Sequence, residues 1–219
     1  MNKKIVAIFI GPPGSGKGNQ AEFLEQKFGF DRLAPGQILR KEIELKTSIG
    51  KKVAKKVEKG FLVDDDIVEK LIAKKYQSVG RKIIFDGFPR NASQTVFLHK
   101  LLKKTPSVKA VFEFNLPLSK VLDRIKGRYH CLKCGENYHL VYRPSKIPLT
   151  CDNCRLKLMK RRDSQSKVVI NRRRVYSQLT KPALKYYKNN QDYQYYKIDA
   201  AKSISQVSEK VNSIIRTLS

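Results

Sequence analysis

The chain has 219 residues, 41% of them hydrophobic, so it can bury a core as one domain with small insertions. Its 46 Lys and Arg residues outnumber its 19 Asp and Glu residues, which gives a formal net charge of +27. No apolar run reaches the length of a membrane span and none follows a charged leader at the N-terminus, so we expect a cytoplasmic protein and not a membrane or exported one.

An apolar strand and a glycine-rich loop open the chain. The run Ile5–Ile10 predicts a buried β-strand, and Gly11-Pro-Pro-Gly-Ser-Gly-Lys-Gly18 follows it directly. Glycines let N–H groups fold around phosphate oxygens, the next helix points its positive end at them, and Lys17 adds a charge. A plain strand–helix turn with a solvated lysine is the alternative. The strand before the loop and the helical segment 20–28 after it favour a nucleoside triphosphate site.

Gly18 occupies the position at which most phosphate loops have Ser or Thr. The hydroxyl of that residue normally binds Mg²⁺. Here magnesium must be held by other groups, largely through water, which Mg²⁺ tolerates because it dehydrates reluctantly.

Strands and helices alternate along the rest of the chain. Further strands are predicted at 31–34, 82–85, 108–114 and 195–198. Helices are predicted at 36–57, from Asp64-Asp65 onward, at 118–126, at 165–189 with an interruption near Lys181-Pro182, and at 205–218. This alternation predicts a parallel sheet of five strands with helices on both faces and ligands at the carboxyl ends of the strands.

The excess of positive charge has two interpretations. The basic residues are either spread over the surface as a compositional habit, or gathered into a stripe that contacts a polyanion such as nucleic acid. Clusters occur at Lys51, Lys52, Lys55 and Lys56, at 160–162 and at 172–174. Nucleic-acid binding stays an alternative. It is not favoured, because the arginines lie at positions that suit an enzyme of phosphoryl transfer. No clean amphipathic basic helix supports binding to a membrane surface.

Four cysteines form two Cys-x-x-Cys pairs, Cys131 with Cys134 and Cys151 with Cys154. This spacing is typical of a zinc site with four thiolates, whose closed coordination makes the metal structural. Disulfides are the alternative, and a cytoplasmic chain disfavours them. His130 and His139 lie nearby, but four thiolates leave no need for them as ligands.

The strand at 82–85 leads into Asp86-Gly-Phe-Pro-Arg90, with Gln94 four residues on. With the phosphate loop, this motif resembles adenylate kinase, in the bacterial form with a long zinc-carrying lid. The resemblance runs from Ile5 to the terminal helix. It implies an α/β P-loop nucleotide kinase with a five-stranded parallel sheet flanked by helices. It divides the chain into a core domain (1–33, 64–126 and 165–219), a helical insertion that binds the nucleoside monophosphate (34–63) and a zinc lid (127–164).

The resemblance also implies reversible, Mg²⁺-dependent transfer of a phosphoryl group from ATP to AMP, giving two ADP, by a monomer. Positioning and positive charge would do most of the catalysis, with Asp86 holding the waters of magnesium. The expected catalytic residues are Lys17, Arg90, Arg124, Arg161 and Arg172. The expected ATP-binding residues are Gly14, Ser15, Gly16, Lys17, Gly18, Asn19, Arg124, Arg128, Asn137, Tyr138 and Lys202. The expected AMP-binding residues are Pro35, Arg40, Phe61, Leu62, Val63, Gly87, Phe88, Arg90, Gln94, Arg161 and Arg172.

Four positions depart from the family pattern. Asn19 replaces a threonine, and Ala34-Pro-Gly-Gln37 replaces Ser-Thr-Gly-Asp, which removes a hydroxyl near AMP and a carboxylate. Ser164 replaces an aspartate, and Arg173 replaces an apolar residue. Two alternatives follow: a kinase that accepts UMP, CMP or GMP, and a basic nucleic-acid-binding protein on the same fold.

Overall fold

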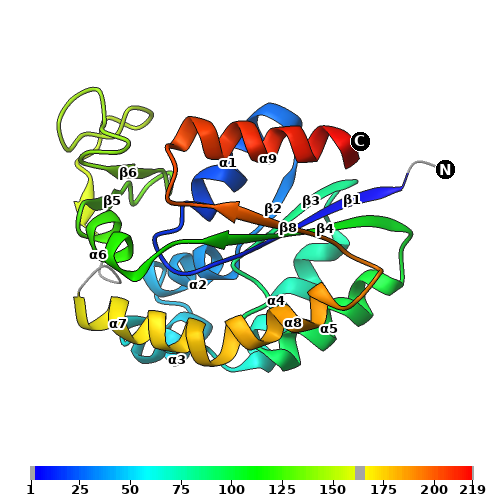
Figure 1. The fold of residues 1–219 in the computed structure, drawn as a ribbon. Helices are drawn as coiled ribbons and strands as arrows, with labels where there is room; N and C mark the ends of the chain where they lie inside the picture. Colours follow the sequence, from blue (N-terminus) through cyan, green and yellow to red (C-terminus); the bar gives the residue numbers. More distant parts are fainter. Residues whose placement is uncertain (1–2, 161–165, 219) are drawn as a thin grey trace.

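A five-stranded parallel sheet forms the centre of the molecule (Figure 1). The computed structural model describes residues 3–160 and 166–218. The strand order is β2-β3-β1-β4-β8, which confirms the predicted parallel sheet of five strands. The strands are β1 (Lys4–Ile10), β2 (Asp31–Leu33), β3 (Lys82–Asp86), β4 (Ser107–Asn115) and β8 (Gln194–Asp199).

Strand β1 lies in the middle of the sheet, and its residues from Ile5 to Ile10 are all buried. Both faces of β1 are covered, so its sequence is a continuous apolar run and does not alternate between apolar and polar residues. In register, Phe9 lies beside Asp86 of β3 and Phe112 of β4. The carboxyl end of β3 therefore lies next to the glycine-rich loop that follows β1.

Helices cover both faces of the sheet (Figure 1). The buried residues of α1 and α9 join one apolar core, and those of α4, α5 and α8 join the other. The helices of the core are α1 (Lys17–Phe28), α4 (Asp65–Gln77), α5 (Ala92–Lys103), α6 (Leu118–Lys126), α7 (Ser166–Val175), α8 (Lys181–Lys188) and α9 (Ile204–Leu218).

The helix predicted at 36–57 is divided, and the interruption predicted near Lys181-Pro182 in the segment 165–189 is present just before that position. The segment 36–57 forms α2 (Pro35–Glu44) and α3 (Ser48–Glu58), because Lys46 adopts a φ of 53° and Thr47 caps α3 by accepting from the Gly50 N–H. The basic segment 165–189 forms α7 and α8 around a π-helical turn over Tyr176–Thr180. The turn comes just before Pro182, which has no N–H for a regular helical bond.

The start of α4 also differs in detail from the prediction. Asp64 occupies the N-cap position, but its side chain makes no capping hydrogen bond. Its carboxylate instead accepts from Nζ of Lys56 in α3 at 2.5 Å. The insertion is therefore held to α4 by an exposed ion pair.

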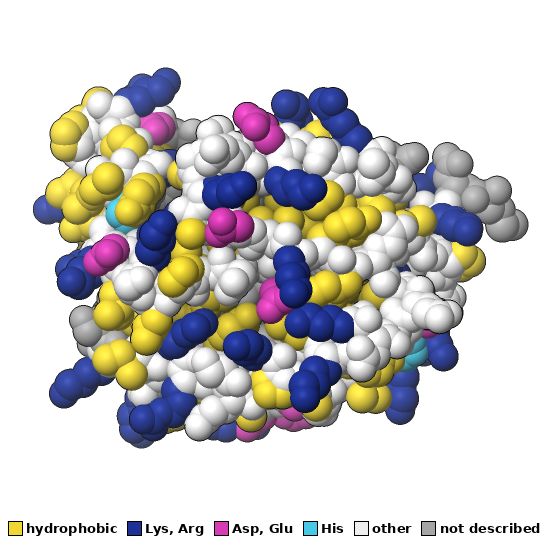
Figure 2. Space-filling view, in the orientation of Figure 1, with side chains coloured by type: hydrophobic (Ala, Val, Ile, Leu, Met, Phe, Trp, Pro, Cys, Tyr) yellow, Lys and Arg dark blue, Asp and Glu magenta, His cyan; other side chains and the backbone are white. Residues whose placement is uncertain are grey.

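The lid follows α6 as a small antiparallel sheet of order β6-β5-β7. Its strands are β5 (Arg128–His130), β6 (Asn137–His139) and β7 (Met159–Lys160). Figure 2 shows Lys and Arg side chains distributed over the visible face and separated by other residues. Within residues 3–160 and 166–218, no helix combines the length and apolarity that a membrane crossing needs.

Candidate active site

The glycine-rich loop joins β1 to α1 at the carboxyl edge of the sheet. Gly14 and Gly16 have φ values of 84° and 83°, in the left-handed region that favours glycine. Gly16 is also the N-cap residue of α1, which begins at Lys17. The first N–H groups of α1 have no helical acceptors and carry the positive end of the helix dipole. The loop and the helix together form an anion site.

Lys17 is half-buried and folded back onto the loop. Its Nζ donates to the carbonyls of Gly11 (2.8 Å) and Pro12 (2.9 Å) and contacts Oγ of Ser15 (3.1 Å). Burial lowers the pKa of Lys17 to about 7, against the raising effect of the Asp86 carboxylate. Three nearby arginines lower the pKa further: Arg90, Arg128 and Arg172. A phosphate group would offset this crowding of positive charge.

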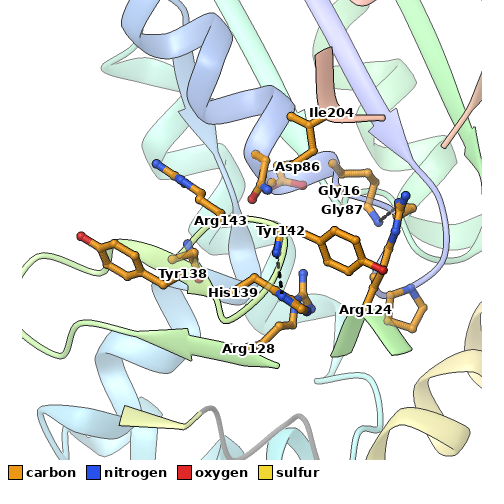
Figure 3. Close-up of a pocket in the computed structure, with 18 of the residues that line it drawn as sticks. Gly16, Asp86, Gly87, Arg124, Arg128, Tyr138, His139, Tyr142, Arg143 and Ile204 are labelled. Carbon is orange, nitrogen blue, oxygen red and sulfur yellow. Dashed lines mark hydrogen bonds between the residues drawn. The ribbon is translucent and has the colours of Figure 1, made fainter. Parts of the chain in front are cut away.

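A cleft of about 770 Å³ lies above the loop, between the core and the lid (Figure 3). It brings together every residue predicted to bind ATP. These are Gly14, Ser15, Gly16, Lys17, Gly18, Asn19, Arg124, Arg128, Asn137, Tyr138 and Lys202. They come from the loop, from α6, from the lid and from the segment after β8.

A second, smaller cavity of about 70 Å³ lies beside the insertion. It is lined by the residues predicted to bind AMP, namely Pro35, Arg40, Phe61, Leu62, Val63, Gly87, Phe88, Arg90, Gln94 and Arg172. Arg161, the remaining predicted residue, lies outside the described residues. Arg40, Arg90 and Arg172 line both cavities, so three guanidinium groups lie where the two cavities meet.

Gln94, which the resemblance predicts to bind AMP, is already held by hydrogen bonds within the protein. Its side chain is 2% exposed. Oε1 accepts from the Arg90 N–H (2.9 Å) and Nε2 donates to Oδ1 of Asp65 (2.7 Å). One N–H and one lone pair of the amide are left for a ligand. Gln94 thus fixes the position of Arg90 whatever else it contacts.

Asp86 lies at the end of β3, against the loop. Both Nε and Nη2 of Arg32 donate to its Oδ2, at 3.1 and 2.5 Å. Burial alone would raise the pKa of Asp86, but Arg32 and Lys17 outweigh burial and the pKa lies below its ordinary value. Asp86 is therefore a carboxylate, and carboxylate oxygens suit Mg²⁺ and its water shell.

The lid contributes five further residues to the cleft lining that were not predicted as site residues: Tyr129, His139, Val141, Tyr142 and Arg143. Figure 3 shows Tyr142 beside Arg124, whose Cζ lies 5.6 Å from the ring centroid. Nη1 of Arg124 also donates to the carbonyl of Ala200 (2.6 Å). His139 Nδ1 accepts from the N–H groups of Val141 and Tyr142 at 3.1 and 3.2 Å, which fixes the turn that bears the tyrosine. The aromatic residues between the two cysteine pairs were the available signal.

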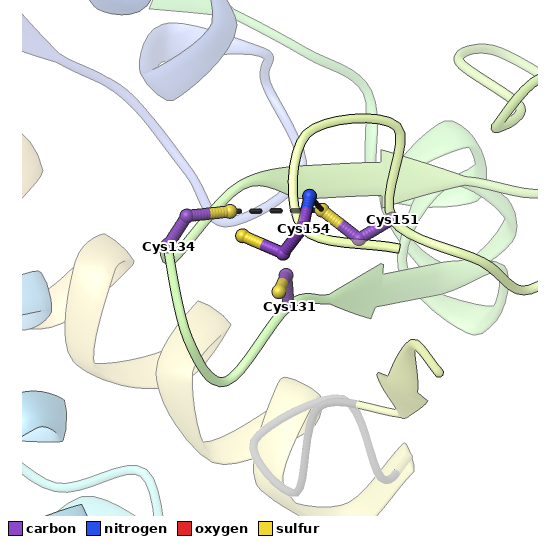
Figure 4. A group of neighbouring side chains, drawn as sticks. All are labelled: Cys131, Cys134, Cys151 and Cys154. Carbon is purple, nitrogen blue, oxygen red and sulfur yellow. Dashed lines mark hydrogen bonds between the residues drawn. The ribbon is translucent and has the colours of Figure 1, made fainter. Parts of the chain in front are cut away.

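The four cysteines gather within the lid (Figure 4). Their sulfur atoms all lie within 4.8 Å of one another, as the ligands of a tetrahedral zinc ion do. Cys134 and Cys151 are 3.6 Å apart and all four cysteines are free, so the group is not a pair of disulfides. Among the described residues the group contains no histidine. The thiolate set fits zinc.

The lid contacts the core through a cluster of three charged side chains. Arg143 binds both carboxylate oxygens of Glu22 in α1, at 3.1 and 2.8 Å, and Oε1 of Glu136 at 2.6 Å. On the opposite side, Nε2 of His130 lies 3.6 Å from Oε1 of Glu44 in the insertion. Burial and the neighbouring Glu22 carboxylate raise the pKa of Glu136 to about 7. The segment 127–160 therefore contacts both α1 and the insertion.

We expect lid closure to become more favourable as the pH falls through about 7. Glu136 has a raised pKa in the closed lid and an ordinary one in water, so the closed form binds more protons between those values. The chain has no tryptophan, so Val141→Trp, at a residue that is 75% exposed, gives a single fluorescent reporter of closure. Glu136→Gln should remove the pH dependence, and exposed Glu209→Gln should keep it. A titration that is flat in the parent protein would contradict this prediction.

The end of the insertion packs closely against α7. A Cβ atom on Gly60 would lie 2.8 Å from the carbonyl of Val168 and 2.9 Å from Cγ of Arg172. Gly60 has a φ of 77°, so both the contact and the backbone favour glycine. Nδ2 of Asn171 donates to the carbonyl of Lys59 (3.1 Å). The insertion therefore touches the helix that bears Arg172.

Comparison with known proteins agrees with this geometry. The family model for adenylate kinase matches residues 9–192. The chain belongs to the adenylate kinase family. It is 38% identical over 185 residues to the adenylate kinase of Caldicellulosiruptor saccharolyticus, an alignment that covers 83% of this chain and 86% of that protein.

Two further adenylate kinases align over nearly the whole chain. That of Archaeoglobus fulgidus is 35% identical over 214 residues, which cover 96% of this chain and 98% of the relative. That of a Hydrogenobaculum species is 33% identical over 213 residues, which cover 96% of this chain and 100% of the relative. Membership of the adenylate kinase family makes this protein a phosphotransferase that acts on nucleotides.

Proposed function

We propose that this adenylate kinase transfers the γ-phosphoryl group of ATP to AMP, giving two ADP, as a cytoplasmic monomer. One observation carries the proposal: the two cavities meet at Arg40, Arg90 and Arg172. Direct transfer between two nucleotides needs two sites that join where their phosphates lie. It also needs positive charge at the junction to stabilise the transferring group.

On the ATP side, the N–H groups of residues 14–19 hold the β- and γ-phosphates. Lys17 exchanges its hydrogen bonds to the carbonyls of Gly11 and Pro12 for bonds to phosphate oxygens. Arg124 and Arg128 approach from the base of the lid. Asn137, Tyr138 and Lys202 enclose the rest of the nucleotide.

On the AMP side, Arg40 and Arg90 bind the phosphate of AMP, and Gln94 uses its remaining N–H and lone pair on the base. The nucleoside lies against Pro35, Phe61, Leu62, Val63, Gly87 and Phe88. Arg172, together with Arg161 outside the described residues, closes on the reacting phosphates. These arginines neutralise the negative charge that otherwise keeps the two nucleotides apart.

Two metals complete the proposal. Magnesium, when bound with ATP, supplies positive charge at the β- and γ-phosphate oxygens. Asp86 accepts hydrogen bonds from its water shell, since Gly18 offers no hydroxyl. Zinc, held by the four cysteines, is structural because four thiolates close its coordination. A lid segment too small for its own core needs such a metal to hold its shape.

We assign residues 34–63 to the insertion that binds the nucleoside monophosphate, residues 127–164 to the zinc lid, and residues 1–33, 64–126 and 165–219 to the core. A closed lid excludes the water that would otherwise hydrolyse the γ-phosphate. The Arg143 contact with Glu22 favours this closed form. Gly127, between α6 and β5, is the hinge at the start of the lid.

Incubation of the protein with MgATP and each of AMP, UMP, CMP and GMP tests the proposal. We expect rapid formation of ADP when AMP is the acceptor. Ion-exchange chromatography separates the nucleotides and measures the ADP formed. Arg90→Ala should lower turnover by about 10²–10³-fold, because it removes a cation from the reacting phosphates. Exposed Arg81→Ala, just before β3 and so at the opposite end of that strand from Arg90, is the matched control and should change little.

Other outcomes identify the alternatives. A preference for UMP, CMP or GMP would assign the specificity to the altered segment 34–37. No transfer to any acceptor, with oligonucleotide binding that weakens steeply with salt, would favour the nucleic-acid-binding alternative.

A further inference from the structure

Arg32 is a cation in the cleft to which the mechanism above gives no role. It lies in β2, next to β3, and reaches the carboxyl end of β3. Its guanidinium donates twice to Oδ2 of Asp86, and the side chains of Arg32 and Asp86 are only 7% and 12% exposed. Arginine stays protonated at every physiological pH, so this charge is permanent.

The guanidinium also lies against the phosphate loop. A Cβ atom on Gly18 would lie 3.0 Å from Nη2 of Arg32 and 3.6 Å from Oδ2 of Asp86. At this position other phosphate loops have the hydroxyl that binds magnesium. Here the hydroxyl is absent and a guanidinium faces the same space, close to the loop N–H groups that hold phosphate oxygens.

The cleft also offers few groups that attract a divalent cation. Position 37 carries Gln in this chain, and among the described residues the cleft lining includes only two carboxylates, Asp86 and Asp123. Asp86 is already neutralised by Arg32. A carboxylate paired with a guanidinium attracts a hydrated cation less than a free carboxylate does.

We propose that Arg32 shares Asp86 with the magnesium ion of the nucleotide and supplies part of the positive charge that the ion brings to the β- and γ-phosphates. The enzyme would then bind metal-free ATP almost as well as MgATP. The inference rests on the proposed ATP site. It concerns nucleotide binding and leaves the metal requirement of phosphoryl transfer unchanged.

Calorimetric titration with ATP, in excess Mg²⁺ and in excess EDTA, tests this inference without turnover. We expect the two dissociation constants of the parent protein to agree within about tenfold. Arg32→Gln should weaken binding of metal-free ATP by about tenfold or more and leave MgATP binding equal or tighter. Arg32→Lys keeps the charge, so its dissociation constant for metal-free ATP should lie between those of the parent protein and of Arg32→Gln. Exposed Arg81→Gln removes the same charge far from the cleft and should keep the parent ratio.

A folded Arg32→Gln protein whose ratio of the two constants equals that of the parent would overturn the inference. If Arg32→Gln does not fold, the parent protein alone decides: metal-free ATP that binds more than about a hundredfold more weakly than MgATP would overturn it. No binding of ATP in either buffer would instead overturn the proposed ATP site, and this inference with it.

Discussion

Lys17→Met is expected to lower turnover by about 10²–10³-fold, because it removes the one mobile cation that the phosphate loop brings to the β- and γ-phosphates. The loop N–H groups and the arginines of the cleft remain, so residual activity is expected. Steady-state assays of ADP formation, with ATP affinity measured separately, would show the loss mainly in kcat. Lys27→Met, on an exposed lysine in the last turn of the same helix, is the matched control.

Lys17→Met should also change how the stability of the folded protein depends on pH. The pKa of Lys17 falls from 10.5 to about 7 on folding, so the unfolded chain binds more protons between these values. Stability therefore rises as the pH increases through this window, and Lys17→Met should remove that contribution. Near pH 7 this unfavourable contribution is still nearly complete, so we expect the melting temperature of the variant to equal or exceed that of the parent. A collapse of the variant would show that Lys17 is structural, which would contradict the assignment.

Removal of zinc should have the second large effect. Without the metal, four thiols cannot hold the lid hairpins, so we expect the lid to lose its fixed shape while the sheet stays folded. The melting temperature should fall, and turnover should fall by about 10²-fold because Tyr142 and Arg128 are no longer positioned. Calorimetry and activity after chelation under reducing conditions, with zinc release measured by a colorimetric dye, would show both changes.

The effect must be reversible if zinc is structural. Adding zinc back should restore the melting curve and the activity, and Cys151→Ser should reproduce the chelated state without a chelator. An unchanged melting curve after verified zinc removal would refute the structural role.

The parts of the site that local sequence patterns predicted are contiguous in the chain, whereas the distant arginines and the AMP-binding residues were predicted from the resemblance to the family. A strand, a glycine-rich loop and a helix are neighbours in sequence, so the surroundings of Lys17 follow from local rules. The Cys-x-x-Cys spacing likewise placed the cysteines of each pair within reach of one another. The contact of Arg32 with Asp86 depends instead on β2 lying beside β3, and strand order is not visible in a single sequence. The lid brings Arg143 to Glu22 across 121 residues of chain, beyond the reach of any local pattern.

Some predictions of helix boundaries were wrong for a related reason. The apolar pattern over 36–57 continues through the break, so periodicity alone predicted one helix there, whereas the interruption predicted near Lys181-Pro182 falls slightly earlier, at Tyr176–Thr180. The break at Lys46 depends on the close packing of Gly50 against the backbone of Glu42, where a Cβ atom would lie 2.0 Å from the carbonyl oxygen. The π-helical turn depends on Pro182 and on the bond from Thr180 to the carbonyl of Arg90 (2.7 Å). Tertiary contacts decided both positions.

The contact of Gly60 with α7 ties the end of the insertion to the helix that bears Arg172. The backbone at this point leaves no space for a side chain, so a substitution here would displace the insertion from α7. Arg40 of α2 lines the same junction of the two cavities as Arg172, so such a displacement would also change how these two guanidinium groups lie relative to each other.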